Sequence, residues 1–240
     1  MRMLALAFTL VYDLLAYPVL AADKTIGVFV ALADNKHQGI APVPAAIGNG
    51  DDPDRNLYWG TSEGLKGYFD HSKRWKLVGK NDVPQKGGIL RTRTYRSPKA
   101  VLYARAYRGS EMKQCITDFE SAVRLGSYDM VVFIGHDGLM DFGLPTPMRS
   151  PTQAKRPDCV VLCCKSEEYF KPRLASAGGR PILLTTQLMY PGSFILGAVA
   201  DTWLGRWRLN DIRMSAGSAY ARNQRISRRA GVGVFADLRD

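Results

Sequence analysis

The order of apolar blocks along the chain predicts alternating strands and helices. Short runs rich in β-branched residues, typical of buried strands, occupy residues 24–34, 99–109, 129–136, 158–166 and 181–188. Apolar spacing and turn signals predict helices over residues 56–69, 110–126, 191–205 and 210–229. Two more polar segments, 75–80 and 89–97, are expected to be edge strands or arms of a hairpin. The expected fold class is therefore α/β: a doubly wound, mostly parallel sheet with helices on both faces.

The amino-terminal segment has the features of a secretory signal peptide. A basic residue precedes an apolar run, and two alanines at positions 21 and 22 offer a cleavage site. An aspartate and a proline interrupt the apolar stretch, which makes it a poor membrane span. We expect residues 1–22 to be removed, leaving residues 23–240 as one domain in the periplasm or outside the cell, with no integral membrane segment. The alternative is an amino-terminal strand or helix that packs on the domain.

Charge and cysteine content narrow the possible partners. The net charge is +11, a sign that favours nucleic acid, an anionic surface or an acidic substrate. The basic residues are spread along the chain without a recognised nucleic-acid-binding motif, so we expect no specific nucleic-acid partner. The four cysteines are too few and too clustered for a disulfide framework, which indicates that some thiols remain free.

Two apolar blocks end in residues that can carry chemistry. The first, within VVFIGHDG, ends in His136, and the next ends in Cys163 and Cys164. If the two strands are parallel neighbours, their carboxyl ends lie about 5 Å apart. An imidazole in that position could accept the proton of a thiol, which is nucleophilic only as the thiolate. Either residue alone is more often structural, but their paired placement favours a Cys–His site. Such a site needs no cofactor and no metal.

The order of these residues along the chain excludes several classes of cysteine enzyme. Papain-like enzymes and nucleophile-elbow enzymes place the nucleophile before the histidine, and the elbow motif is absent. A cysteine phosphatase would need an arginine six residues after the cysteine, where Tyr169 and Phe170 stand. The absence of C-x-x-C argues against a thioredoxin-type redox site.

An apolar block with His136 and a nearby glycine, followed by an apolar block with Cys164 in CCKS, resembles the caspase-like (clan CD) superfamily of cysteine peptidases. That superfamily includes caspases, legumains, gingipains, separases and bacterial CHAT domains. The resemblance implies a caspase-like fold, a peptide or protein substrate, His136 as general base or acid, and Cys164 as nucleophile. Cys164 is preferred over Cys163 because the family's cysteine closes its strand and is commonly followed by a charged or polar residue and a small one, here Lys165 and Ser166.

The resemblance also implies donors for an oxyanion and residues that contact substrate. The donors would be the backbone N–H groups of Cys164 and of Asp137 or Gly138. The family usually has glycine directly after its histidine, where this chain has Asp137. The segments DNKHQG and TTQLMYPGSF supply the implied substrate-pocket residues, which are Lys36, His37, Gln187, Tyr190 and Ser193.

Two other functions fit the same residues. A non-catalytic caspase-like binding or scaffold protein would use the ends of the strands for a ligand or partner. A thiol redox sensor would use the adjacent Cys163 and Cys164, which could form a strained disulfide.

Overall fold

A seven-stranded mixed sheet forms the centre of the protein in the computed structural model, which describes residues 23–238. The predicted signal segment, residues 1–22, lies outside the described residues. The strands are β1 (Lys24–Ala31), β2 (Lys76–Asn81), β3 (Ile89–Arg96), β4 (Ala100–Tyr107), β5 (Met130–Ile134), β6 (Asp158–Leu162) and β7 (Arg180–Leu183). Their order across the sheet is β2-β3-β4-β1-β5-β6-β7. The five strands from β4 to β7 are parallel, and β2 and β3 form the predicted hairpin at one edge.

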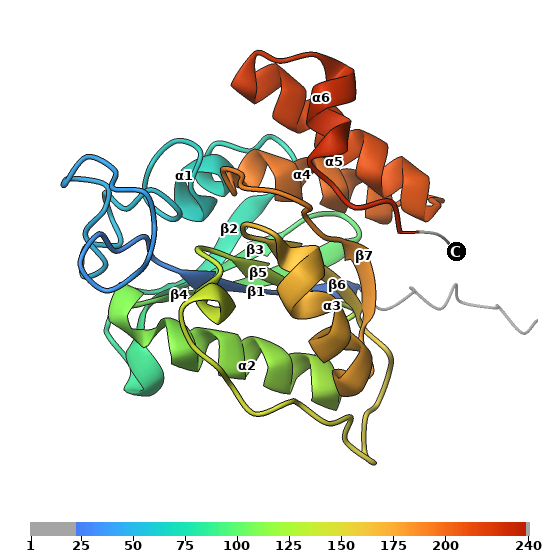
Figure 1. Ribbon diagram of the computed structural model, residues 1–240, viewed down its shortest axis with the longest axis horizontal. Helices are drawn as coiled ribbons and strands as arrows, with labels where there is room; N and C mark the ends of the chain where they lie inside the picture. The colour runs from blue at the N-terminus through green and yellow to red at the C-terminus, as the bar shows by residue number, and fades with distance from the viewer. Residues whose placement is uncertain (1–22, 239–240) are drawn as a thin grey trace, which may run out of the picture.

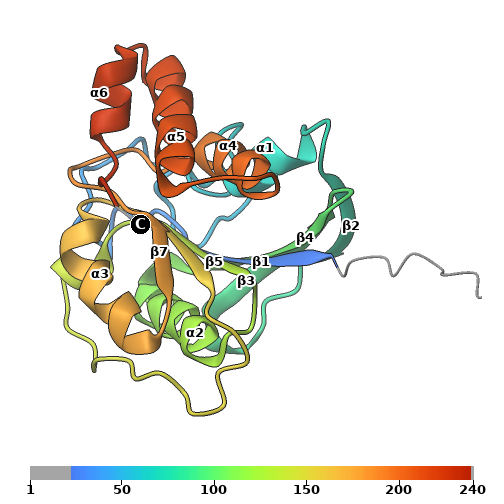
Figure 2. The ribbon, with the colours of Figure 1, turned by 90° about the vertical axis from the view of Figure 1, so that its right-hand side faces the viewer.

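Helices cover both faces of the sheet, as the sequence predicts (Figures 1 and 2). The α-helices are α1 (Leu65–Asp70), α2 (Met112–Leu125), α3 (Ser166–Ala177), α4 (Ser193–Trp203), α5 (Leu209–Gln224) and α6 (Arg228–Gly233). Helices α2 and α3 lie on one face, and α1, α4 and α5 lie on the other. Among residues 23–238, none of the helices has the length and apolar character needed to cross a membrane.

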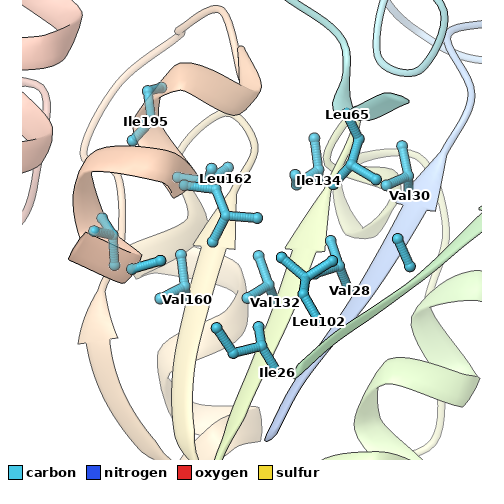
Figure 3. Packing of buried hydrophobic residues seen from close by; sticks show 14 of the residues in the cluster. Ile26, Val28, Val30, Leu65, Leu102, Val132, Ile134, Val160, Leu162 and Ile195 are labelled. Carbon is cyan, nitrogen blue, oxygen red and sulfur yellow. The ribbon is translucent and has the colours of Figure 1, made fainter. Parts of the chain in front are cut away.

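Strand residues that are apolar on both faces hold these layers together. In β1, Val28 and Val30 contribute to the core beneath α1 and α4, whereas Phe29 and Ala31 contribute to the core beneath α2. Figure 3 shows part of the first of these cores, with side chains from the parallel strands packed near Leu65 and Ile195. Burial on both faces explains why the parallel strands appear in the sequence as continuous apolar runs.

The strand order contains a topological switch point between β1 and β5. The chain first adds β4 on one side of β1 and then crosses to add β5, β6 and β7 on the other side. In open α/β sheets, ligands bind outside the carboxyl ends of the strands at such a switch point. A functional site is therefore expected at the loops that follow β1 and β5.

Several predictions of secondary structure need correction, including the strands predicted over 158–166 and 181–188, which end at Leu162 and Leu183. The helix predicted from residue 56 begins only at Leu65, because the carbonyl of Asn56 accepts three N–H groups in tight turns instead. The helix predicted over residues 210–229 is two helices, since Arg225 is left-handed with φ +53° and Ser227 caps a new helix. Helix α3 was not predicted, and it contains Pro172 in its interior.

Candidate active site

His136 and Cys164 lie at the same end of neighbouring parallel strands. In the pairing of β5 with β6, Ile134 is opposite Leu162, and the N–H of Gly135 donates to the carbonyl of Leu162 at 3.2 Å. Each of the two candidate residues therefore follows its strand by two positions. A Cys–His pair at these positions needs the two strands to be parallel neighbours, and the register confirms that they are. Within residues 23–238, no hydrogen bond joins the two side chains.

The imidazole of His136 is only 7% exposed and is held by a carboxylate that the sequence analysis did not identify. Its Nε2 lies 2.8 Å from Oδ2 of Asp141, and the same oxygen accepts the N–H of Gly39 at 3.1 Å. A carboxylate accepts a hydrogen bond, so in the neutral ring the proton belongs on Nε2. The other ring nitrogen, Nδ1, then carries the lone pair that a general base needs.

The loop after β1 reaches the histidine through Asp141. The buried Asp34 shapes this loop by accepting the N–H groups of Lys36 and His37 and by contacting the His37 ring at 2.8 Å. The Lys36 and His37 side chains are exposed. Because Gly39 bonds to Asp141, both predicted pocket residues belong to a loop that contacts the partner of His136.

The thiol of Cys164 contacts the segment that follows β7. Its half-buried Sγ lies 3.5 Å from the backbone nitrogen and 3.7 Å from the carbonyl oxygen of Met189. The N–H of Lys165 donates to the carbonyl of Gln187 at 3.1 Å. The segment containing the predicted residues Gln187 and Tyr190 therefore lies directly beside the candidate nucleophile.

A sharp turn from strand to helix presents Cys164. The strand ends at Leu162, earlier than predicted, and α3 begins at Ser166. Between them, Lys165 has a left-handed backbone with φ +48°, which is uncommon for a residue other than glycine. Hydrogen bonds between Ser166 and Thr185, including Thr185 N–H to Ser166 Oγ at 2.8 Å, hold the turn. Backbone strain of this kind is found at functional sites when the surroundings fix it.

The two adjacent cysteines have different environments. Cys163 is fully buried in the core beneath α2 and α3, with Phe170 and Leu174 in the same cluster. Burial raises the pKa of the Cys163 thiol well above its ordinary value, and the nearby Asp137 raises it further. A buried thiol with a raised pKa is a poor nucleophile. Burial and electrostatics thus agree with the preference for Cys164.

Asp137 is a buried carboxyl group beside the candidate histidine. Its Oδ1 accepts the N–H of Leu139 at 3.0 Å, and its Oδ2 has no hydrogen-bond partner within residues 23–238. Burial raises the pKa of Asp137 from 3.8 to about 7, and the charges of Asp141 and Glu168 act in the same direction. The hydrogen bond from Leu139 and the neighbouring Cys163 thiol act in the opposite direction. Asp137 is therefore largely protonated below neutral pH.

Replacing Asp137 with asparagine is expected to remove part of the pH dependence of stability. The folded protein binds the Asp137 proton more tightly than the unfolded chain does. The stabilisation of the folded state by this proton is therefore complete below pH 3.8 and is lost as pH rises through about 7. The slope is about 1.4 kcal/mol per pH unit between the two pKa values. Asp137→Asn should therefore gain free energy of unfolding relative to wild type as pH rises, measured by urea unfolding from about pH 4 to pH 8.

Asp82→Asn is the matched control for that experiment. A hydrogen bond from Arg93 lowers the pKa of Asp82 below 3.8, so this exposed carboxyl does not titrate in the same range. The control should follow the wild-type slope. A wild-type slope retained in Asp137→Asn would contradict the assignment of a buried, protonated carboxyl.

The two predicted oxyanion donors after the histidine differ in their hydrogen bonds. The N–H of Gly138 donates to the carbonyl of His136 at 3.1 Å. In the part of the chain that the structure describes, the N–H groups of Asp137 and Cys164 have no hydrogen-bond acceptor. Gly138 is needed for packing, since a Cβ atom there would lie 2.4 Å from Sδ of Met112. Asp137 and Cys164 are therefore the better pair of donors.

Of the predicted pocket residues, Tyr190 lies in the turn before α4, and Ser193 is the first residue of that helix. Tyr190 is half-buried, and its N–H donates to the hydroxyl of Tyr220 at 3.3 Å. Ser193 is fully buried, and its N–H donates to the carbonyl of Glu63 at 2.8 Å. The hydroxyl of Ser193 has no partner within residues 23–238.

The fold and this site define an α/β protein with a histidine and a cysteine at the carboxyl edge of its sheet. In comparisons with models of protein families, with curated proteins and with solved structures, no match to this chain was found. Within residues 23–238, no group of three or more His, Cys, Asp or Glu side chains is placed to hold a metal ion.

Proposed function

We propose that this protein is a cysteine-dependent hydrolase of the caspase-like kind that cleaves a peptide or related acyl bond. The observation that carries the proposal is the register of β5 and β6, by which His136 and Cys164 each follow the paired ends of adjacent parallel strands by two residues. The loop that carries His136 borders the switch point between β1 and β5, and the Asp141 partner of the histidine adds further support. Catalytic hydrogen bonds are often long before substrate binds, so the lack of a direct bond between the two side chains is compatible with this role.

In the proposed reaction, His136 takes the thiol proton of Cys164 on Nδ1, and the thiolate Sγ then attacks the carbonyl carbon of the substrate. The N–H groups of Cys164 and Asp137 then stabilise the developing oxyanion. His136 returns its proton to the leaving amine, which gives an acyl-enzyme on Cys164. Water attacks this thioester with His136 as base, and the carboxylate product leaves with the thiol restored. Asp141 keeps the proton on Nε2 during these steps and stabilises the imidazolium.

Replacing Asp141 with asparagine is expected to lower kcat/KM by about 10²-fold. The asparagine can offer an N–H instead of an oxygen to Nε2, which favours the wrong tautomer of His136. The measurement is the pH profile of kcat/KM for wild type and variant. Asp129→Asn is a control outside the site, because Asp129 contacts Lys155 and Thr25 at the other end of β1. Equal activities of wild type and Asp141→Asn would exclude the positioning role.

The proposed function is tested by incubating the protein with a diverse mixture of peptides and identifying the products by mass spectrometry. The expected result is cleavage at a restricted set of bonds by the wild type and none by Cys164→Ala or His136→Ala. Cleavage that persists in both variants would come from a contaminant or another site. No cleavage by a folded wild type would favour the non-catalytic binding protein, in which Asp137 replaces the family's usual glycine.

A further inference from the structure

A cavity of about 670 Å³ lies at the end of the sheet opposite the candidate active site. One wall is the turn before β4, at Ser97–Lys99, and another is the end of α4 around Asp201 and Leu204. Because β4 is parallel to β1 and β5, this turn lies at the amino ends of the parallel strands. The cavity is thus separate from His136 and Cys164, and its role does not depend on the proposed hydrolase activity.

Cationic side chains dominate the rim of this cavity. They are Lys73, Arg74, Lys76, Arg96 and Lys99, and among residues 23–238 the lining itself includes one carboxylate, that of Asp201. Arg74 pairs with Asp201 at 2.8 Å, and Arg96 pairs with Asp23. Within residues 23–238, the three lysines have no carboxylate at ion-pair distance. Three unpaired cations around one concave surface favour an anionic ligand.

The cavity also has an apolar lining. Trp75 forms part of it and is fixed from behind by the ring of Phe69, with 5.7 Å between ring centroids. Leu204 and the exposed Val78 add further apolar surface. A volume of this size suits a small molecule, and ligand sites commonly combine an apolar lining with a few polar groups that fix orientation.

We infer that this cavity binds a small amphipathic anion, in which a phosphate or carboxylate head meets the three lysines and an apolar body contacts Trp75, Val78 and Leu204. Arg74 and Arg96 are already paired and would shape the rim. The head group belongs either to a free soluble metabolite or to a lipid, and the experiment separates these sources.

The test is a titration with octyl phosphate in which binding is measured by tryptophan fluorescence and by calorimetry. The expected result is saturable binding of one molecule per chain. Inorganic phosphate alone should bind at least about tenfold more weakly, because it lacks the apolar body. The triple variant Lys73→Glu, Lys76→Glu, Lys99→Glu should weaken octyl phosphate binding by at least about tenfold. These lysines are exposed, and thermal unfolding verifies that the variant is folded.

A triple variant outside the cavity, Lys86→Glu, Arg149→Glu, Arg229→Glu, changes the net charge equally and is the matched control. It should bind octyl phosphate within about twofold of wild type. Equal weakening in the two triple variants, or equal affinity for phosphate and octyl phosphate, would overturn the inference. In the last experiment, binding of the protein to vesicles that contain an anionic phospholipid is measured. Binding to vesicles without binding of octyl phosphate would also overturn it and would indicate a membrane-binding surface instead.

Discussion

Replacing Cys164 with alanine should remove peptide hydrolysis, with a fall in kcat of about 10³-fold or more, because no other thiol lies at the paired ends of β5 and β6 with an accessible sulfur. The variant should remain folded, since the half-buried thiol makes only weak contacts with the backbone of Met189. The measurement is the rate of product formation from the peptide that wild type cleaves best, with circular dichroism to verify the fold.

Cys163→Ala is the matched control, one residue away. Its thiol is fully buried in the core, so the variant should lose about 1–2 kcal/mol of unfolding free energy and keep most of its turnover. Equal loss of activity in the two variants, or loss only in Cys163→Ala, would overturn the assignment of the nucleophile. The pair of variants also tests the redox-sensor alternative. That function requires both cysteines, so it would be lost equally in either variant.

Replacing Asn56 with alanine should destabilise the protein by about 3–5 kcal/mol. The fully buried amide accepts the N–H groups of Ala33 and Tyr58, at 3.0 and 3.1 Å. It also donates to the carbonyls of Ala33 and Asn49, at 2.8 and 3.0 Å. Alanine leaves these groups without partners, and buried unsatisfied polar groups are costly. The measurement is the free energy of unfolding in urea.

Asn35→Ala is the control for this experiment. Its amide makes two hydrogen bonds to the backbone of Val43 in the same long loop, but it is exposed, and water can replace the lost bonds. The expected cost is below about 1 kcal/mol. The same loop contains Gly39, whose N–H donates to Asp141, the partner of His136. Asn56→Ala should therefore reduce turnover as well. A cost for Asn56→Ala as small as for Asn35→Ala would contradict the role of Asn56 in fixing the loop.

The sequence indicates the layers of the fold because burial on both faces leaves a clear pattern. The runs at 131–134 and 159–162 are apolar throughout, which is the pattern of strands inside a parallel sheet. The same pattern extends these strands a few residues beyond their ends at Ile134 and Leu162, but it still indicates the neighbourhood of His136 and Cys164. The sequence leaves the parallel pairing of these two strands as a condition, and the register of β5 with β6 meets it.

Helix α3 was not predicted from the sequence, although its buried residues have helical spacing. Phe170, Leu174 and Ala177 face the core, but Pro172 lies between them and polar residues occupy most of the remaining positions. Proline removes one backbone donor and normally ends a helix. The ion pair between Arg173 and Glu120 of α2, at 2.6 Å, joins this helix to its neighbour and is visible only once the two are in contact.

The partners of the candidate residues also depend on tertiary contacts. Asp141 follows His136 by five residues, a spacing that carries no signal for a pairing in a loop. Gly39 meets the same carboxylate across 102 positions of sequence, and Met189 meets Cys164 across 25. The ends of the apolar runs indicate the histidine and the cysteine, whereas no local pattern in the sequence indicates groups that loops bring together.

The most direct test of the proposed Cys–His pair is the rate of alkylation of Cys164 by iodoacetamide as a function of pH, resolved by mass spectrometry, in wild type and in His136→Ala. We predict that Cys164 reacts at about pH 6 nearly as fast as at about pH 8, and that His136→Ala slows the reaction at the lower pH by roughly tenfold. Slow labelling that rises only toward alkaline pH and is the same in both proteins would contradict the proposal that His136 activates Cys164.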